Sequence, residues 1–199
     1  MRTSLAGEGV HEVGDGDGLG ALQALIGRLA PNLRIEEVRF WKDRSVPPLH
    51  GRGGGFYKRA LRWVIRARED GFDALVLVVD EDGDHVRSTQ FATAQDDPDF
   101  TMPRALGVAV RTFDAWMLAD TAALSHVLER VVDTQPEPEG IADPKDRIKA
   151  LIDRSPVTDA QRTVYAQIAG RVSIPVLEER CPRGFATFAE RVRKLSTSP

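Results

Sequence analysis

The chain is poor in cysteine and in long apolar runs, and each shortage excludes a class of protein. Its single cysteine, Cys181, rules out a disulfide framework and a cysteine zinc cluster, and it suits a reducing compartment. No apolar run approaches the roughly 20 residues of a transmembrane helix, and the first residues lack the basic and apolar segments of a signal peptide. We therefore expect a cytoplasmic protein that does not bind membranes.

Several motifs with known chemistry are missing as well. The glycine-rich stretch 51–55 lacks the Gly-Lys-Ser/Thr ending of a P-loop, and no G-x-S-x-G marks a serine hydrolase. A calcium-binding loop starting at Asp80 fails because its twelfth position is Phe91, where a glutamate is required. The net charge of −3 argues against a protein that coats nucleic acid in general. Function therefore has to be inferred from smaller groups of residues.

The sequence alternates apolar segments of strand length with amphipathic segments of helix length. Its 199 residues, 42% of them hydrophobic, are enough for one domain with a sizeable core. We expect strands at 2–7, 33–41, 75–79 and 106–111, and helices at 19–29, 56–70 and 114–128. This order predicts an α/β fold, with a parallel sheet of about four strands flanked by helices and a helical C-terminal extension. The expected parts are an α/β domain at 1–132, an exposed linker at 133–143 and the extension at 144–199, packed on the same domain.

Acidic residues follow the most apolar of the expected strands. The run Leu75–Val79 is typical of a buried parallel strand, and Asp80, Asp82 and Asp84 come directly after it. Carboxylates crowded at one strand end repel each other, and a divalent cation among them removes that repulsion. Because a glycine follows Asp82, Asp80 and Asp82 are the better metal-binding pair. The alternative is a polar turn that closes the strand and caps the next helix.

Other acids follow other expected strands. Glu8 follows the first strand and Asp114 follows the fourth. Ligands of open α/β sheets bind at the carboxyl ends of the strands, so neighbouring strands would bring Glu8, Asp80, Asp82 and Asp114 together there. Asp114 is equally well explained as the N-cap of a helix, and Asp120 as a buried structural acid.

Basic and acidic residues are segregated along the chain. Residues 42–68 contain eight basic side chains and one acid, whereas residues 69–99 contain ten acids and one arginine. This arrangement suits a polyanion held beside a metal, with phosphate contacts from basic residues near the glycine-rich stretch. The candidate phosphate or nucleic-acid contacts are Arg52, Lys58, Arg59 and Arg62, with Lys145 as a further anion site. The alternative is a solvated helix face and a flexible loop.

The order of these motifs resembles the Toprim domain of topoisomerases, bacterial primases and overcoming-lysogenization-defect nucleases. The shared pattern is a glutamate after the first strand and a D-x-D after a later apolar strand. The opening segment Ala6–Glu12 looks like the start of an uncharacterised Toprim-like family that is often encoded near bacterial defence genes. The matching segments are Ala6-Gly-Glu-Gly-Val-His-Glu12, Gly71–Asp82, Phe113–Asp120, Asp143-Pro-Lys145 and Cys181-Pro-Arg-Gly-Phe185.

The resemblance implies Mg²⁺-dependent phosphodiester cleavage (Mn²⁺ being the alternative ion), with nucleic acid as the partner. Asp80 and Asp82 would ligate the metal, and Glu8 would be a ligand or a general acid/base. Asp114 stands where the family has glutamate, so its carboxylate has a shorter reach. Glu12 would either support the metal ligands without touching the ion or face solvent.

Two other functions remain open at this stage. A non-catalytic subunit would keep the fold and use residues 42–68 to bind nucleic acid or a protein partner from a defence system. A haloacid-dehalogenase-like phosphatase would use Asp80 as nucleophile with Thr112 and Lys145, but the helical tail offers no further acidic strand end. Substrate and oligomeric state are not disclosed by the sequence.

Overall fold

The computed structural model describes residues 1–15, 18–42, 46, 49–50 and 53–197. Four parallel strands form its main sheet: β1 (Arg2–Gly7), β4 (Arg34–Phe40), β5 (Ala74–Asp80) and β6 (Arg104–Ala109). They lie in the order β4-β1-β5-β6, which confirms the predicted α/β fold. A short antiparallel pair, β2 (Gly14–Asp15) and β3 (Gly18–Leu19), stands apart from this sheet.

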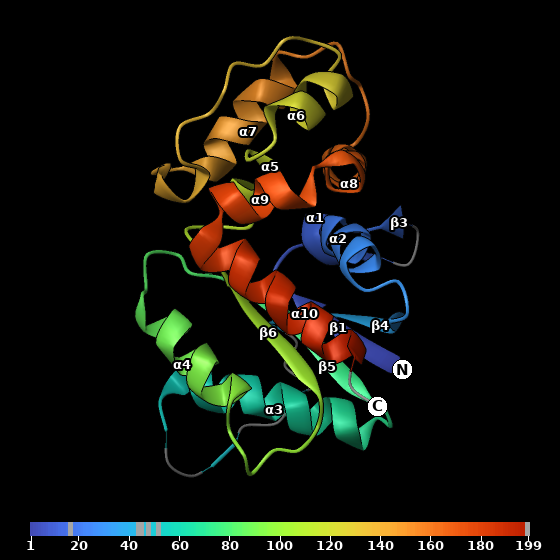
Figure 1. The fold of residues 1–199 in the computed structure, drawn as a ribbon, viewed down its shortest axis with the longest axis vertical. Coiled ribbons are helices and arrows are strands. Elements are labelled where there is room, and N and C mark those ends of the chain that lie inside the picture. The colour runs from blue at the N-terminus through green and yellow to red at the C-terminus, as the bar shows by residue number, and fades with distance from the viewer. Residues whose placement is uncertain (16–17, 43–45, 47–48, 51–52, 198–199) are drawn as a thin grey trace.

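Helices flank the sheet and continue beyond it (Figure 1). Those of the first half are α1 (Val10–Val13), α2 (Ala21–Leu29), α3 (Gly55–Glu69) and α4 (Val86–Gln95). Those of the second half are α5 (Asp114–Met117), α6 (Thr121–Val127), α7 (Pro144–Asp153), α8 (Gln161–Arg171), α9 (Ile174–Arg180) and α10 (Thr187–Thr197). Two shorter turns are a 3-10 helix, η1 (Pro138–Gly140), and a π-helix, η2 (Pro182–Ala186). None of the described helices is long and apolar enough to cross a membrane.

The central strand β5 is apolar throughout because both of its faces are covered. Leu75, Leu77 and Val79 pack in a cluster with side chains of α3 and α4. Val76 and Val78 point the other way, into a cluster with α2, α8 and α10. Alternate side chains of a strand point to opposite faces, so a continuous apolar run fits a strand buried between two helical layers.

The helix α10 lies directly against β6. A Cβ atom added to Gly107 would lie 2.8 Å from the Phe188 ring, so a side chain at this position of β6 would displace the helix. Phe188 and Val192 belong to the same apolar cluster as Val76 and Val78 of β5. The extension therefore shares one hydrophobic core with the sheet.

Three predicted features differ in the structure. The single helix expected at 114–128 is wrong: α5 ends at Met117, and Asp120 starts α6 by accepting hydrogen bonds from the backbone N–H groups of Ala122 (3.0 Å) and Ala123 (3.1 Å). Between the strands expected at 75–79 and 106–111, where no helix was among those expected, the structure has the ten-residue helix α4. The linker is not exposed at Gln135, Pro138 and Glu139, which are buried, because Glu139 binds the backbone of η2.

Candidate functional site

The carboxyl ends of β1, β5 and β6 carry the acids that the sequence singles out. β5 lies between β1 and β6, with Ala6 of β1 beside Leu77 of β5 and Asp80 of β5 beside Ala109 of β6. Glu8 therefore follows one neighbour of β5, and Asp114 follows the other. We call Glu8, Glu12, Asp80, Asp82 and Asp114 the carboxylate cluster.

Asp80 is the central member of the carboxylate cluster. Its Oδ1 accepts a hydrogen bond from the backbone N–H of Phe113 at 2.7 Å. The pKa of this carboxyl is raised to about 8, mainly by burial; the Phe113 bond lowers it, and the charges of Glu8, Asp114 and Asp82 raise it. Asp80 therefore keeps its proton at neutral pH unless a cation balances its neighbours.

The short helix α1 turns Glu12 inward beneath Glu8. The Glu12 side chain is only 8% exposed, and its Oε2 accepts a hydrogen bond from the backbone N–H of Glu8 at 3.1 Å. Burial and then the charge of Asp80 raise the pKa of Glu12 well above its usual value. Of the two alternatives for Glu12, the structure shows the supporting position and not the solvent-facing one.

Glu8 itself is half-buried beside Asp82. Burial is the first cause that raises the pKa of Glu8, and the charge of Asp82 is the second. Asp82 lies in a turn, with a left-handed φ of 50° followed by Gly83 at 74°. The strand alternation therefore ends at Asp80, one step earlier than expected, although Asp82 still acts electrostatically on Glu8 and Asp80.

Arg87 is the counter-ion of this part of the cluster. Its Nη1 donates to Asp82 Oδ2 at 2.8 Å and to the Asp80 carbonyl at 2.6 Å, and it lies 3.8 Å from Glu8 Oε1. The guanidinium stacks over the Phe56 ring of α3 at 4.6 Å. Sequence reasoning missed this role, although Arg87 is the one basic residue of the acidic segment 69–99.

The opposite side of the cluster is closed by a residue of the extension. Tyr165 of α8 is buried and donates its hydroxyl proton to Asp114 Oδ1. Burial, followed by the charge of Asp114, raises the pKa of this phenol. The His11 ring lies 5.4 Å from that of Tyr165, and its Nδ1 is buried without a partner among the described residues. No local sequence signal points to Tyr165, since it reaches Asp114 across 51 positions.

Three further candidates lie at the margins of the cluster. Asp84 Oδ1 accepts a hydrogen bond from the backbone N–H of Val86 at 3.1 Å, so it belongs to the start of α4. Asp120 caps α6 and also accepts a hydrogen bond from the Ser173 N–H at 2.7 Å. These contacts fit the interpretation of Asp120 as a structural acid. Lys145 is exposed at the start of α7, and its charge lowers the pKa of His11 after the larger effect of burial.

The basic candidates of the first half gather on α3. Lys58, Arg59 and Arg62 line one small pocket with Leu49 and Gly55. Arg52 lies outside the described residues.

The carboxylates of the cluster are of the type that binds Mg²⁺, but in this structure they are too far apart to coordinate one ion together. Glu8, Asp80 and Asp82 offer carboxylate oxygens, the ligands that Mg²⁺ prefers. Among the described residues, however, no three His, Cys, Asp or Glu side chains come close enough together to hold a metal ion. Arg87 bridges Glu8 and Asp82, so coordination requires these carboxylates to exchange the guanidinium for the ion.

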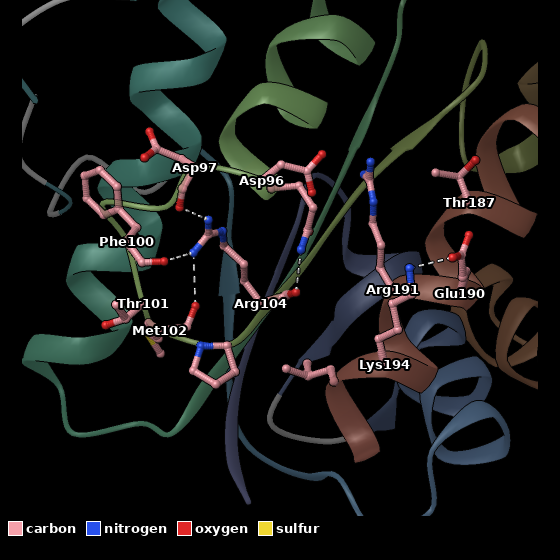
Figure 2. Close-up of a pocket in the computed structure, with 13 residues that line it drawn as sticks. Asp96, Asp97, Phe100, Thr101, Met102, Arg104, Thr187, Glu190, Arg191 and Lys194 are labelled. Atoms are coloured by element: carbon pink, nitrogen blue, oxygen red, sulfur yellow. Dashed lines mark hydrogen bonds and ion pairs between the residues drawn. The ribbon is translucent and has the colours of Figure 1, made fainter. Parts of the chain in front are cut away.

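Larger cavities lie away from this edge. The pocket of about 560 Å³ in Figure 2 is built around Arg104, the first residue of β6, and Arg191 of α10. Arg104 already donates to the backbone carbonyls of Ala94 (2.9 Å), Asp97 (2.8 Å) and Met102 (3.1 Å). Its guanidinium therefore holds the loop before β6 and is not available to a ligand.

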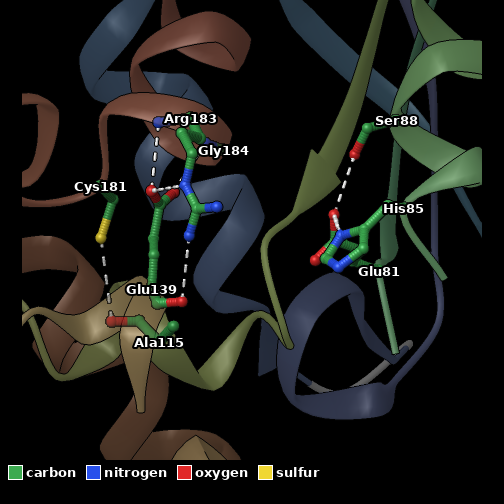
Figure 3. Close-up of polar contacts among 8 residues, drawn as sticks. All are labelled: Glu81, His85, Ser88, Ala115, Glu139, Cys181, Arg183 and Gly184. Atoms are coloured by element: carbon green, nitrogen blue, oxygen red, sulfur yellow. Dashed lines mark hydrogen bonds and ion pairs between the residues drawn. The ribbon is translucent and has the colours of Figure 1, made fainter. Parts of the chain in front are cut away.

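Glu81, between Asp80 and Asp82, does not join the cluster. Its Oε1 accepts from the Ser88 hydroxyl at 3.3 Å and lies 3.0 Å from His85 Nδ1, both near the start of α4 (Figure 3). These contacts hold the Glu81 side chain against α4 and away from the cluster.

In comparisons with known proteins, no family model, curated protein or solved structure matches the chain. The Toprim-like relationship therefore stays a prediction.

Proposed function

We propose that the chain is a Mg²⁺-dependent phosphodiesterase that cleaves nucleic acid. The observation that supports this proposal is the position of Asp80, partly buried at the end of the central strand, where the charges of Glu8, Asp82 and Asp114 act on it. Mutual repulsion makes this arrangement costly unless a cation binds, which is the usual logic of a carboxylate metal site.

The cluster would supply metal ligands and a proton acceptor, and Glu8 could serve as either. Glu8, Asp80 and Asp82 would hold the ion, with Asp114 as the fourth carboxylate at the edge. A bound Mg²⁺ would supply positive charge to the phosphate and to the attacking water. Glu8, half-buried and with a raised pKa, is suited to accept the proton of that water. Arg87, once released from Asp82, would neutralise charge on the phosphate.

A second candidate is a non-catalytic subunit that binds nucleic acid or a protein. The observation in its favour is Arg87, which already balances Glu8 and Asp82 without a metal. The phosphatase alternative is disfavoured because the described residues after β6 form only helices and loops, and they provide no further strand end with an acid.

Titration with Mn²⁺, followed by electron paramagnetic resonance, tests the metal site first. We expect wild-type protein to bind the ion and Asp80→Asn to lose binding. Asp84→Asn is the matched control, since it removes a carboxylate from the same connection but outside the cluster. Cleavage of single-stranded DNA, duplex DNA and RNA is then compared with Mg²⁺ and with EDTA. Absence of Mn²⁺ binding at millimolar concentration would overturn the proposal, and binding without cleavage of any strand would favour the non-catalytic subunit.

A further inference from the structure

A small pocket on α3 is lined by cations without acids. It has a volume of about 210 Å³, and its described lining residues are Leu49, Gly55, Lys58, Arg59 and Arg62. None of these is acidic, and three carry a positive charge. We call this cavity the α3 pocket.

The cations of the α3 pocket are held in place by the surrounding core. The Arg59 guanidinium lies 4.1 Å from the centre of the Trp41 ring and donates to the Trp41 carbonyl at 3.0 Å. Trp41 is buried between Trp63 and Phe91, so this platform is rigid. The Nε of Arg62 is buried without a hydrogen-bond partner among the described residues. Ordered donors that lack an acceptor are what an anion would complete.

The helix itself adds positive potential to the α3 pocket. Gly55 is the first residue of α3, and the first turn of this helix contains no acidic residue. Helix N-termini favour acids and disfavour cations over about the first turn, yet Lys58 is the fourth residue of α3 and Arg59 the fifth. The helix dipole opposes these two cations, whereas it would attract an anion bound between them.

The α3 pocket adjoins the carboxylate cluster. Burial is the main cause that lowers the pKa of Arg59, and the charge of Arg62 is the next, which places these two cations against each other. The Trp41 backbone joins the two sites: its carbonyl accepts from Arg59, and its N–H donates at 2.7 Å to the carbonyl of Gly7, the residue before Glu8. Arg87, the counter-ion of the cluster, stacks over the Phe56 ring in the first turn of α3.

We propose that the α3 pocket binds a phosphate group of a nucleic-acid strand, next to the phosphate that faces the carboxylate cluster. The identity of the strand rests on the proposed function, whereas the affinity for a phosphate group does not. Binding in the α3 pocket needs no metal, because arginine and lysine supply the charge.

The test is strand binding in EDTA, measured by fluorescence anisotropy with short single-stranded DNA carrying either a 5′-phosphate or a 5′-hydroxyl. Arg62→Gln removes one pocket cation, and Arg68→Gln is the matched control on the exposed last turn of α3. We expect Arg62→Gln to weaken binding about tenfold, and to reduce the slope of log affinity against log salt by about 0.7. We expect Arg68→Gln to bind as wild type does and Arg62→Lys to restore most of the affinity. Thermal denaturation shows whether each variant is folded.

Each outcome bears on the proposal. Tighter binding of the 5′-phosphorylated strand, lost in Arg62→Gln, supports a terminal phosphate, and equal loss for both strands supports an internal one. Equal affinity of wild type and Arg62→Gln overturns the proposal. If inorganic phosphate raises the Tm of the wild-type protein but no strand binds to it, the assignment of the ligand as nucleic acid is overturned. Asp80→Asn separates the two claims, since it should abolish cleavage and keep strand binding. If no protein cleaves while Arg62→Gln loses binding, the α3 pocket stands and the nuclease fails.

Discussion

Two kinds of buried acid occur in this molecule, and their partners differ. Glu139 and Asp120, on the side of the extension, are held by N–H donors: Glu139 Oε1 accepts from Gly184 at 2.6 Å and its Oε2 from the Arg183 backbone at 3.1 Å (Figure 3). Asp80, at the end of β5, accepts one backbone N–H and otherwise faces carboxylates. Burial is common to both regions, and only the neighbours differ.

This difference separates acids that stabilise the fold from acids that cost it stability. A buried carboxylate that accepts several N–H bonds keeps its charge and ties segments together. A buried carboxylate among other carboxylates raises the free energy of the folded chain. Carboxylates with strongly raised pKa values cluster at functional sites, so the cluster around Asp80 is the better candidate site.

The largest expected effect is the loss of metal binding in Asp80→Asn. Removal of a ligand should weaken Mn²⁺ binding by more than about 100-fold, beyond the cost of losing an outer-shell partner. In EDTA the same change should stabilise the fold. The folded state holds the Asp80 proton up to about pH 8, whereas the unfolded state releases it near pH 3.8, so the charge costs stability as pH rises between them. We expect the Tm at pH 8, measured by calorimetry, to rise by at least about 2–4 °C, the shift that 1 kcal/mol produces in a chain of this size. An unchanged or lower Tm would remove the distinction between the two kinds of acid.

Glu139→Ala is the converse test. It leaves the N–H groups of Arg183 and Gly184 without their acceptor, and we expect the free energy of unfolding to fall by about 3 kcal/mol in urea denaturation. Mn²⁺ affinity should not change, because Glu139 lies outside the carboxylate cluster. A variant as stable as wild type would show that its hydrogen bonds do not hold the extension.

Tyr165→Phe tests whether the extension supports the site. The change deletes the hydroxyl that binds Asp114 and keeps the buried ring. We expect Mn²⁺ affinity to fall about tenfold, as for other outer-shell partners, and the free energy of unfolding to fall by about 1 kcal/mol. Tyr57→Phe is the control, since it deletes the other tyrosine hydroxyl of the chain, which donates to Asp97 and not to a member of the carboxylate cluster. Equal metal affinity in the two variants would confine Tyr165 to a structural role.

The smallest expected effect concerns Cys181. Burial raises the pKa of this thiol to about 12, and the nearby Glu139 raises it too. Native protein should therefore react slowly with a disulfide reagent at pH 8, and at the normal rate only when unfolded. The unfolded thiol loses its proton near pH 9 and the folded one near pH 12, so stability should fall across this range in wild type. Unfolding curves of Cys181→Ala, which lacks this titration, provide the comparison.

The sequence predicts which acids lie at the carboxyl ends of the strands, but it does not predict the residues that surround them. Apolar runs locate the strands, and Glu8, Asp80 and Asp114 follow strand ends, so adjacency of β1, β5 and β6 is enough to bring them together. Arg87 and Tyr165 were not predicted, because their contacts depend on how α4 and α8 pack. The interruption of the helix expected at 114–128 was not predicted either, since one carboxylate oxygen of Asp120 is bound by the backbone N–H of Ser173, 53 positions away. Long-range partners leave no periodic signal in the chain.

The close contact between Gly107 and Phe188 has a consequence for synthesis. The strand that carries Gly107 leaves the ribosome about 80 residues before the helix that covers it. At roughly 5–20 residues per second, that face of β6 waits about 4–16 seconds for its partner. A nascent chain of this protein exposes apolar strand surface during that time, and we expect its yield to depend on chaperones that shield such surfaces.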